Sequence, residues 1–568
     1  MELLIERLLL VKSATAPSAS PKGAIYYLSD VLGQYNIWRF DGRRHDALFP
    51  WDGRISAFSI SPKGDVAFAA DVGGDERWRL HLYVEDSVRP IALEGVNNLG
   101  SWDPEGRRLA YTSTAQDPAN FCVYVYDSEK GESRKLADLP GINVVTDWGA
   151  AGILVHHAES SRDGDIYLVK DGEAKNLTKH SGEEINAGAK FLGDNKIIYL
   201  TNRGSEHVGL AVMDLTSGEA KYLVQLDREI EAFDVWGNYV AFAVNEDGFS
   251  SLYIYHLPTG LTHKVAIPPG VVTSLSWRYG RLVFSLSGPR IGHEVFAYAA
   301  EVRQLTDSPK FGLDFSQNAV PEAVKYKASD GLEVPALLYK PAGSPPYRAV
   351  VWLHGGPESQ ERPDFDPVVQ LLVRLGYLVA APNFRGSAGY GRTYLRLDDG
   401  EKRLDAVRDV ADFVKWLQEQ GLASGKPCAM GGSYGGYLTL MSLALYPDLW
   451  SCGVEVAGIT NLATFLERTA PWRRRHREAE YGRLEDRGLL ERLSPTTYVD
   501  RIAAPLLVIH GVNDIRVPIS EAEQLVERLK ALGRAVEFLR LEGEGHVLST
   551  QGRARAYRAA AEFIRKYL

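Results

Sequence analysis

A repeat of about 43 residues fills the first half of the chain and constrains its fold more than any other feature. Each unit holds a short β-like run with an aromatic or branched centre, then a second run that ends in a turn rich in Asp, Gly and Ser. A period of about 40–45 residues with several strands per unit is typical of a β-propeller, and a β-sandwich would not keep so narrow a period by chance. The runs begin 41 to 44 residues apart, at Ile25, Val66, Leu109, Ile153, Ile197, Val240 and Leu282. Seven repeats predict seven blades.

The pattern changes near residues 311–321, where the repeats stop. Residues 324–341 are typical of a β-hairpin that turns at Asp330-Gly331, and buried apolar strands then alternate with helices. This alternation predicts a doubly wound, mainly parallel sheet. Because 568 residues exceed one hydrophobic core, we expect a short amphipathic helix in residues 1–20, a propeller in residues 21–312 and an α/β domain in residues 313–568.

Charge and composition exclude several classes of function. The chain has 64 Lys and Arg against 73 Asp and Glu, a net charge of −9, so it lacks the basic balance typical of nucleic-acid binding. No stretch approaches the roughly 20 apolar residues of a membrane span, and Glu2 and Glu6 stand where a signal peptide carries positive charge. The three cysteines are far apart, which favours a reducing compartment. We expect a cytoplasmic protein that binds neither nucleic acid nor membrane.

Residues 431–435, Gly-Gly-Ser-Tyr-Gly, match the nucleophile elbow Gly-x-Ser-x-Gly. In this motif the serine lies on a sharp turn between a strand and a helix, where larger flanking residues would collide with backbone. Here a short apolar strand precedes the motif and Gly436 opens a helix, so Ser433 is predicted to be the nucleophile of an α/β-hydrolase domain. A serine hydroxyl reacts only when a neighbouring base takes its proton.

The acid and the base of this fold follow the serine in the order Ser, Asp or Glu, His. Of the aspartates between Ser433 and the last histidine, only Asp514 follows the carboxyl end of a strand, where α/β sheets place their sites. His546 lies in a loop directly after the strand of residues 536–541 and is predicted to be the base. His510 ends the strand before Asp514, and we interpret it as a buried structural histidine.

Two backbone donors are expected to bind the oxyanion of the tetrahedral intermediate. One is the N–H of Tyr434, which follows the nucleophile. The other is the N–H of Gly356, in the glycine-rich loop His354–Pro357, whose histidine is expected to hold the loop in shape. The sequence indicates no phosphate loop, no metal site and no cofactor, and the basic run Arg473–Arg477 is interpreted as a solvated helix face.

Several motifs of the second half resemble those of the prolyl oligopeptidase family of serine peptidases, which join a seven-bladed propeller to an α/β-hydrolase domain. They are HGGP, NFRGSAGYG, GGSYGGY, HGVNDIRVP and GEGH, at residues 354–357, 383–391, 431–437, 510–518 and 543–546. Together with the repeats, the resemblance runs nearly end to end. The chain is most similar to the acylaminoacyl peptidase branch of archaeal type, in which a short N-terminal helix packs back on the hydrolase domain.

The resemblance implies the release of N-acylated amino acids from short blocked peptides, and esterase activity on small activated esters. It implies that Arg516 binds the carbonyl of the acyl group or of the residue before the cleaved one. It also implies that Phe465 and Trp472 line the pocket for the cleaved residue. Short, N-acylated peptides would be the partners, no cofactor would be needed, and homo-oligomer formation stays open.

Two other hypotheses stay open at this point. A dipeptidyl aminopeptidase of the same family would grip a free α-ammonium with a carboxylate pair, and Glu183-Glu184 is the neighbouring pair in the propeller. A propeller interaction module with an inactive hydrolase domain is the third hypothesis, and the filled catalytic positions argue against it.

Overall fold

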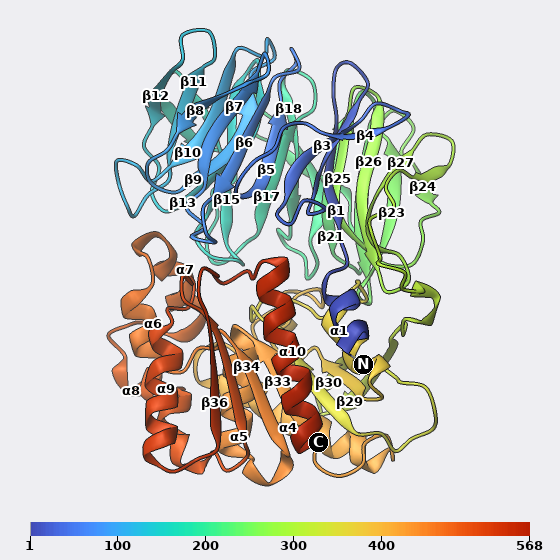
Figure 1. Cartoon of the computed structure of the whole chain (residues 1–568). Helices are drawn as coiled ribbons and strands as arrows, with labels where there is room; N and C mark the ends of the chain where they lie inside the picture. The colour runs from blue at the N-terminus through green and yellow to red at the C-terminus, as the bar shows by residue number, and fades with distance from the viewer. Residues whose placement is uncertain (1) are drawn as a thin grey trace.

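The computed structural model describes residues 2–568 and shows a propeller stacked on an α/β domain (Figure 1). Seven four-stranded antiparallel sheets form the propeller, each from four consecutive strands. The first is β1 (Ala14–Ala19), β2 (Ile25–Ser29), β3 (Asn36–Phe40) and β4 (His45–Ala47). The runs recognised in the sequence repeat are the second and third strands of each sheet, so the prediction of seven blades is confirmed.

The other six blades follow in chain order. The next three are β5 (Arg54–Ile60), β6 (Val66–Asp71), β7 (Arg79–Val84) and β8 (Ser87–Ala92); β9 (Asn97–Trp102), β10 (Arg108–Ser113), β11 (Cys122–Asp127) and β12 (Glu132–Ala137); and β13 (Ile142–Gly149), β14 (Gly152–Ala158), β15 (Gly164–Lys170) and β16 (Glu173–Asn176). The last three are β17 (Asn186–Phe191), β18 (Lys196–Thr201), β19 (Gly209–Asp214) and β20 (Ala220–Val224); β21 (Ile230–Trp236), β22 (Tyr239–Glu246), β23 (Phe249–His256) and β24 (Leu261–Val265); and β25 (Val271–Arg278), β26 (Arg281–Gly288), β27 (Gly292–Tyr298) and β28 (Val302–Gln304).

The first blade starts earlier in the chain than the expected boundary at residue 20. Strand β1 begins at Ala14 and pairs antiparallel with β2, so only α1 (Glu2–Leu9) lies outside the propeller in residues 1–20. The sequence of β1, ATAPSA, lacks the aromatic or branched centre of the other runs, which is why the repeat does not reveal it. The ring closes by packing of β1 against the last blade, where Thr15 Oγ1 donates a hydrogen bond to Ser285 Oγ at 3.3 Å.

The α/β domain is built on one eight-stranded sheet in the order β29-β30-β32-β31-β33-β34-β35-β36. The β29–β30 hairpin and the β30–β32 pair are antiparallel, and the remaining neighbours are parallel, which confirms the predicted doubly wound, mainly parallel sheet. The strands are β29 (Glu322–Lys327), β30 (Glu333–Tyr339), β31 (Ala349–Leu353), β32 (Leu378–Pro382), β33 (Cys428–Gly432), β34 (Cys452–Val456), β35 (Leu506–Gly511) and β36 (Val536–Leu541).

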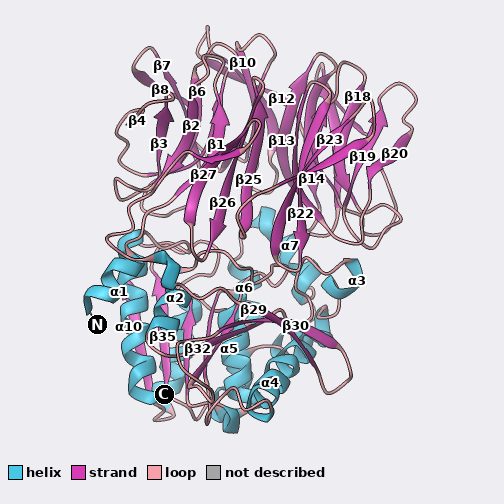
Figure 2. Cartoon of the chain, turned by 90° about the vertical axis from the view of Figure 1, so that its right-hand side faces the viewer, coloured by secondary structure: helices cyan, strands magenta, loops and turns pink. Residues whose placement is uncertain are grey.

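Helices cover both faces of this sheet (Figure 2). They are α2 (Pro367–Arg374), α3 (Arg392–Leu395), α4 (Arg403–Glu419), α5 (Tyr434–Leu445), α6 (Leu462–Arg468), α7 (Pro471–Tyr481), α8 (Arg487–Arg492), α9 (Ser520–Ala531) and α10 (Thr550–Tyr567), with short 3-10 turns at Phe315–Gln317, Gly400–Lys402, Pro447–Leu449 and Pro495–Arg501. One hydrophobic core joins α4, α5 and α9 to the sheet, and a second joins α2 and α10 to its other face. Across residues 2–568 no helix combines the length and the apolar character needed to cross a membrane.

Helix α1 belongs to the second of these cores. Its residues Ile5, Leu8 and Leu9 are buried together with apolar residues of α2 and α10, and Glu6 pairs with Arg558 of α10 at 2.6 Å. Because α1 precedes the propeller in the chain, its packing against α2 and α10 ties the start of the chain to its end.

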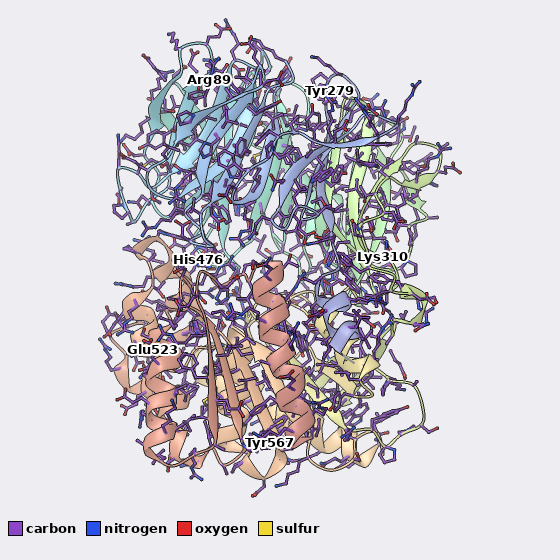
Figure 3. All side chains as sticks on the ribbon, viewed as in Figure 1. Arg89, Tyr279, Lys310, His476, Glu523 and Tyr567 are labelled. Atoms are coloured by element: carbon purple, nitrogen blue, oxygen red, sulfur yellow. The ribbon has the colours of Figure 1, made fainter. Side chains whose placement is uncertain are left out.

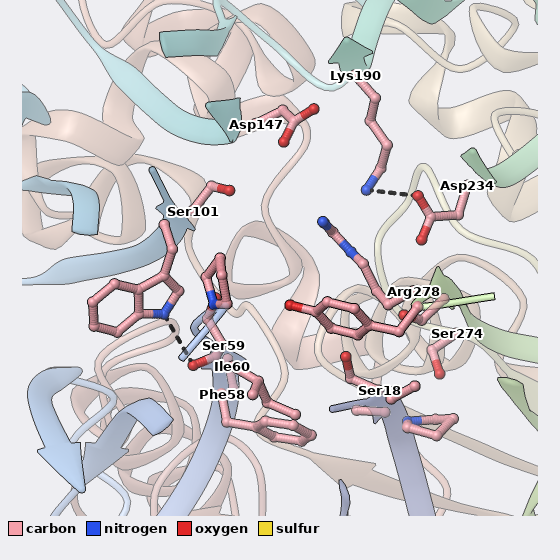
Figure 4. Close-up of a pocket in the computed structure, with 18 of the residues that line it drawn as sticks. Ser18, Phe58, Ser59, Ile60, Ser101, Asp147, Lys190, Asp234, Ser274 and Arg278 are labelled. Atoms are coloured by element: carbon pink, nitrogen blue, oxygen red, sulfur yellow. Dashed lines mark hydrogen bonds and ion pairs between the residues drawn. The ribbon is translucent and has the colours of Figure 1, made fainter. Parts of the chain in front are cut away.

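A cavity of about 490 Å³ lies where the first strands of the blades converge (Figure 4). The residues that line it all belong to the propeller, between Ala16 and Tyr279. Lys190 and Asp234 form an ion pair of 3.0 Å in its wall. The lining comes from the later residues of these strands, whereas their first residues face the α/β domain. The cavity therefore lies at the end of the propeller that is remote from the α/β domain.

Candidate active site

Ser433 lies at the turn between β33 and α5, as the elbow motif predicts. Its backbone has φ 56° and ψ −118°, a conformation that non-glycine residues rarely adopt and that is typical of strained functional positions. The turn is crowded, because a Cβ added to Gly435 would lie 1.9 Å from the Leu353 carbonyl oxygen. A Cβ added to Gly431 would lie 2.5 Å from the Gly435 backbone, so larger residues at either glycine would displace the serine.

Asp514 and His546 lie in the loops that follow β35 and β36, which are parallel neighbours. His546 Nδ1 is 2.6 Å from Asp514 Oδ2, and Asp514 Oδ1 accepts the backbone N–H groups of Arg516 and Val517 at 2.8 and 2.9 Å. Burial alone would raise the pKa of Asp514, but hydrogen bonds from two histidines hold the pKa well below its ordinary value. An ionised Asp514 keeps the proton of His546 on Nδ1, so Nε2 is free to act as a base.

The topology of the sheet brings these residues to the same edge as Ser433. Strands β33, β34, β35 and β36 are consecutive parallel neighbours, and each of the three residues follows the carboxyl end of its strand. Within residues 2–568 no hydrogen bond joins Ser433 Oγ to the His546 ring. Catalytic hydrogen bonds are often long until the substrate complex forms, so this arrangement is compatible with a triad.

A second histidine contacts the same carboxylate. His510 is fully buried, and its Nε2 is 2.8 Å from the Val517 carbonyl oxygen and 3.5 Å from Asp514 Oδ2. Burial would lower the pKa of His510, but the hydrogen bond with Asp514 and the charge of Glu455 raise it, which favours the imidazolium. Asp514 therefore lies between two imidazole rings.

Glu455 is a buried residue of this region that sequence reasoning missed. It lies in β34, and its Oε2 accepts the N–H of Gly458 at 2.7 Å, while Oε1 has no hydrogen-bond partner within residues 2–568. Burial raises the pKa of Glu455 to about 7. The signal in the sequence is a glutamate inside an otherwise apolar strand, where a charged residue needs a specific reason to be present.

The glycine-rich loop after β31 passes directly beside the nucleophile. A Cβ added to Gly355 would lie 3.5 Å from Ser433 Cβ, and Gly356 has φ 125°, which a residue with a side chain rarely adopts. Tyr434 is the first residue of α5, and the first N–H groups of a helix have no partner within it. The loop and the helix end thus flank Ser433 from two sides.

His354 has contacts that fit a role in holding this loop. Its ring stacks on Phe384 at 4.3 Å, and its Nε2 is 2.9 Å from Ser387 Oγ. Burial lowers the pKa of His354 to about 4, so the ring is neutral.

A propeller loop, residues 72–76, reaches the loops of the α/β domain that carry Asp514 and His546. Arg516 Nε donates a hydrogen bond to Glu76 Oε2 at 2.7 Å. A Cβ added to Gly74 would lie 2.8 Å from the backbone nitrogen of Gly545, which precedes His546. Contacts between residues more than 400 positions apart leave no periodic signal in the sequence, so sequence reasoning missed this loop.

The two aromatic residues predicted to line a pocket pack on different partners. Phe465 is almost fully buried in α6, where it meets the Tyr481 ring edge-on at 5.9 Å. Trp472 lies at the start of α7 and meets Phe121 of the propeller edge-on at 5.3 Å. Their joint role in substrate binding stays a prediction.

Three acidic residues near the elbow lie close enough to share a cation. Ligand atoms of Asp398, Asp399 and Glu480 are within 4.8 Å of one another. However, Arg403 is 3.1 Å from Asp398 and 2.5 Å from Glu480, and Arg162 is 2.5 Å from Asp399. Two guanidinium groups already compensate these carboxylates, so the cluster is a network of ion pairs.

A family sequence model and an individual relative both indicate the same protein family. The sequence model of the prolyl oligopeptidase family matches residues 363–568. Dipeptidyl peptidase family member 6 of Caenorhabditis elegans is 31% identical over 541 residues, which cover 84% of this chain and 71% of that protein. Dipeptidyl aminopeptidase BIII of Pseudoxanthomonas mexicana is 35% identical over 225 residues, 38% of this chain, and the match spans only 32% of that protein.

Solved structures show the same fold over almost the whole chain. A puromycin hydrolase superposes with a TM-score of 0.87 at 20% identity, covering 98% of this chain and 94% of that one. The acylaminoacyl peptidase of Pyrococcus horikoshii superposes with a TM-score of 0.77 at 21% identity, covering 98% and 96%. The chain belongs to the prolyl oligopeptidase family and is a serine peptidase.

Proposed function

We propose that this peptidase releases N-acylated amino acids from the N-terminus of short blocked peptides and also hydrolyses small activated esters. In this proposal Ser433 is the nucleophile, His546 is the base and Asp514 orients the base. The backbone N–H groups of Tyr434 and Gly356 bind the oxyanion. The hydrogen bond between Asp514 and His546, at the sheet edge that also carries the elbow, supports this assignment of roles.

The reaction runs in two halves. Ser433 Oγ attacks the carbonyl carbon of the acylated residue while His546 Nε2 takes the hydroxyl proton. The negative charge that develops on the carbonyl oxygen is stabilised by the two backbone donors and by the positive end of α5. His546 then gives the proton to the amine of the departing peptide, and water activated by the same histidine hydrolyses the acyl-enzyme.

The observation that carries the proposal is the state of Arg516, which fits the carbonyl before the cleaved residue. An N-acylated amino acid and a free dipeptide both present this carbonyl, so the substrate comparison below separates them. Of the three guanidinium nitrogens of Arg516, only Nε forms a hydrogen bond within residues 2–568, to Glu76 at 2.7 Å. This contact orients the planar guanidinium and leaves both terminal nitrogens to donate to a carbonyl oxygen. Arg516 lies two residues after Asp514, so a carbonyl bound there would be held at a fixed place relative to the triad.

A dipeptidyl aminopeptidase is the second candidate, and the names of two relatives favour it. Such an enzyme needs carboxylates for a free α-ammonium. Glu183 and Glu184 are both ion-paired with arginines, at 2.6 and 2.8 Å, which argues against the pair considered from the sequence. Glu229 and Glu358 line a cavity of about 120 Å³ between the domains and are the alternative place for an ammonium.

The test compares kcat/KM on acetyl-alanine p-nitroanilide, alanyl-alanine p-nitroanilide and p-nitrophenyl butyrate. We expect the acetylated anilide to be preferred over the free dipeptide. A charge-assisted hydrogen bond contributes roughly 1.5–3 kcal/mol, so Arg516→Ala should cost about 10- to 150-fold on the acetylated anilide. The butyrate ester lacks that carbonyl and should lose little, and Arg516→Lys should not restore activity, because one point charge cannot replace the planar fork.

Two outcomes would contradict this function. Equal losses on the anilide and the ester would show that Arg516 acts by shaping the Asp514 loop and not by binding substrate. A clear preference for the free dipeptide would replace the acyl-peptidase activity with the dipeptidyl one. Ser433→Ala is the common control, because it should lose both turnover and labelling by a fluorophosphonate probe.

A further inference from the structure

Helix α7 presents cationic side chains to the space between the two domains. It runs along the top of the α/β domain, and Figure 3 places His476 at the boundary with the propeller. His476 Nε2 is 3.0 Å from the carbonyl oxygen of Ala158 in the propeller, and Trp472 packs on Phe121. These two contacts fix the face of α7 that carries residues 473, 476 and 477 toward the propeller, since residues three and four apart share a helix face.

Arg473 and Arg477 on this face have no carboxylate partner. Within residues 2–568, neither guanidinium forms an ion pair, although α7 lies among well-paired arginines such as Arg162 and Arg403. Arg473 instead lies over the ring of its neighbour Trp472, at 5.4 Å from the centroid. Burial, with the positive charges of Arg477 and Arg516 nearby, lowers the pKa of Arg473 to about 10. Arg473 is partly buried, and an unpaired cation at such a position gains more from a bound anion than a fully exposed one does.

The acidic groups close to Arg473 are already engaged. Glu76 binds Arg516 at 2.7 Å and lies 3.9 Å from Arg54. Asp514 is shared between His546 and His510. Arg516 is thus paired with Glu76, whereas Arg473 and Arg477, on the α7 face toward the propeller, carry a positive charge that no ion pair within residues 2–568 neutralises.

We propose that Arg473, together with Arg477, forms a subsite for a carboxylate of the peptide substrate. The proposal rests on the proposed peptidase function and specifies the substrate class of that site. The carboxylate has two sources in a short peptide, an acidic group on the acyl side of the cleaved bond or the C-terminus of the departing peptide. Both present the same two oxygens to a guanidinium fork, which binds a carboxylate through two parallel hydrogen bonds.

The test uses two matched pairs of substrates, one for each source. For the acyl side, kcat/KM on succinyl-alanine p-nitroanilide is divided by that on acetyl-alanine p-nitroanilide. For the departing side, acetyl-alanyl-alanine is compared with its C-terminal amide. We expect at least one ratio to exceed about ten in the wild-type enzyme, as for a charge-assisted hydrogen bond, and the ratio that does so identifies the source.

Arg473→Gln should bring that ratio close to one, because the amide keeps a donor and loses the charge. Arg475→Gln is the matched control on the same helix, since Arg475 is 66% exposed and its ion pair with Glu159 is 3.7 Å long. The control should keep the wild-type ratio. Fluorophosphonate labelling at the wild-type rate shows that each variant is folded.

Two results would overturn the subsite: both wild-type ratios near one, or a ratio that Arg473→Gln leaves unchanged. Failure of the acyl-peptidase function is a separate result, in which neither acetylated nor succinylated anilides are cleaved and free dipeptidyl anilides are. In that case, the subsite is tested with aspartyl-alanine against alanyl-alanine p-nitroanilide, and the same two results would overturn it.

Discussion

Replacement of His510 by glutamine should change the pH dependence of the enzyme more than its fold. The amide nitrogen of glutamine can take over the hydrogen bond from His510 Nε2 to the Val517 carbonyl oxygen, 2.8 Å away. The variant loses a side chain that can carry a positive charge, and the pKa of His510 is raised above its ordinary value. In the native enzyme, a proton on the catalytic base would place a second cation beside the first. Because the variant lacks the first cation, we expect its activity to be lost at a higher pH.

The size of this shift follows from the geometry. Both imidazoles contact the same atom, Asp514 Oδ2, at 3.5 and 2.6 Å, so their nearest nitrogens are at most about 6 Å apart. Two unit charges at that distance repel by about 0.7 kcal/mol in water and by about 2.8 kcal/mol at an effective dielectric constant of 20. Since about 1.4 kcal/mol corresponds to one pKa unit, the acid limb should move upward by roughly 0.5 to 2 pH units.

The assay is the pH profile of kcat/KM between pH 5 and 8 on p-nitrophenyl butyrate, whose binding does not depend on Arg516. His476→Gln is the matched control, because His476 bonds a propeller carbonyl at 3.0 Å and does not contact the triad. The control should keep the native acid limb. An unchanged acid limb in His510→Gln, even with reduced activity, would refute the charge-based reasoning and leave His510 a purely structural residue.

Two further predictions concern buried and crowded positions. Glu455 has a pKa raised to about 7, above the ordinary value near 4.5, so the native state loses stability as pH rises through this range. Glu455→Gln should therefore raise the free energy of unfolding of the α/β domain by on the order of 2–3 kcal/mol at pH 8 and by little at pH 4, measured by denaturant titration at both pH values. Equal effects at both pH values would contradict the ionisation argument. Gly74→Ala places a Cβ 2.8 Å from the Gly545 backbone and should lower kcat/KM on every substrate by about 10- to 100-fold, because small displacements of catalytic groups are costly. Gly218→Ala has the same φ of 74° with nothing within 4 Å of the added atom, so similar losses in both variants would attribute the effect to backbone strain alone.

The parts of the fold that could be predicted are those with a local, repeating signal. The second and third strands of every blade carry branched or aromatic residues at a fixed period, and the parallel strands β31, β33 and β35 are continuous apolar runs. Strand β1 could not be predicted in this way, because its sequence ATAPSA has neither pattern. It is a strand because it pairs with β2 and packs on the last blade, which is a tertiary effect.

The residues of the candidate site were likewise predictable only where a local sequence motif marks them. The elbow, Asp514 and His546 are each marked by a short motif at the carboxyl end of a strand, and the structure brings the last two within 2.6 Å. Phe465 and Trp472 lack such a mark: which way an aromatic ring points depends on packing partners such as Tyr481 and Phe121, which belong to other elements. The sequence predicts a solvated face for the basic run of α7, and Arg475 is exposed as expected, whereas Arg473 is partly buried at the boundary with the propeller.

The contacts between propeller residues 72–76 and the α/β domain support the loops that carry Asp514 and His546. Glu76 accepts a hydrogen bond from Arg516, which lies two positions after Asp514. Gly74 lies against the backbone of Gly545, which lies one position before His546. Any separation of the propeller from the α/β domain that breaks these contacts also removes support from both loops. The Glu76–Arg516 pair is largely shielded on the propeller side, where the Glu76 side chain is 7% exposed, so losing it would leave a buried carboxylate without its partner. The docked state is therefore favoured by the same interaction that orients the guanidinium beside Asp514, which couples closure of the domains to assembly of the catalytic loops.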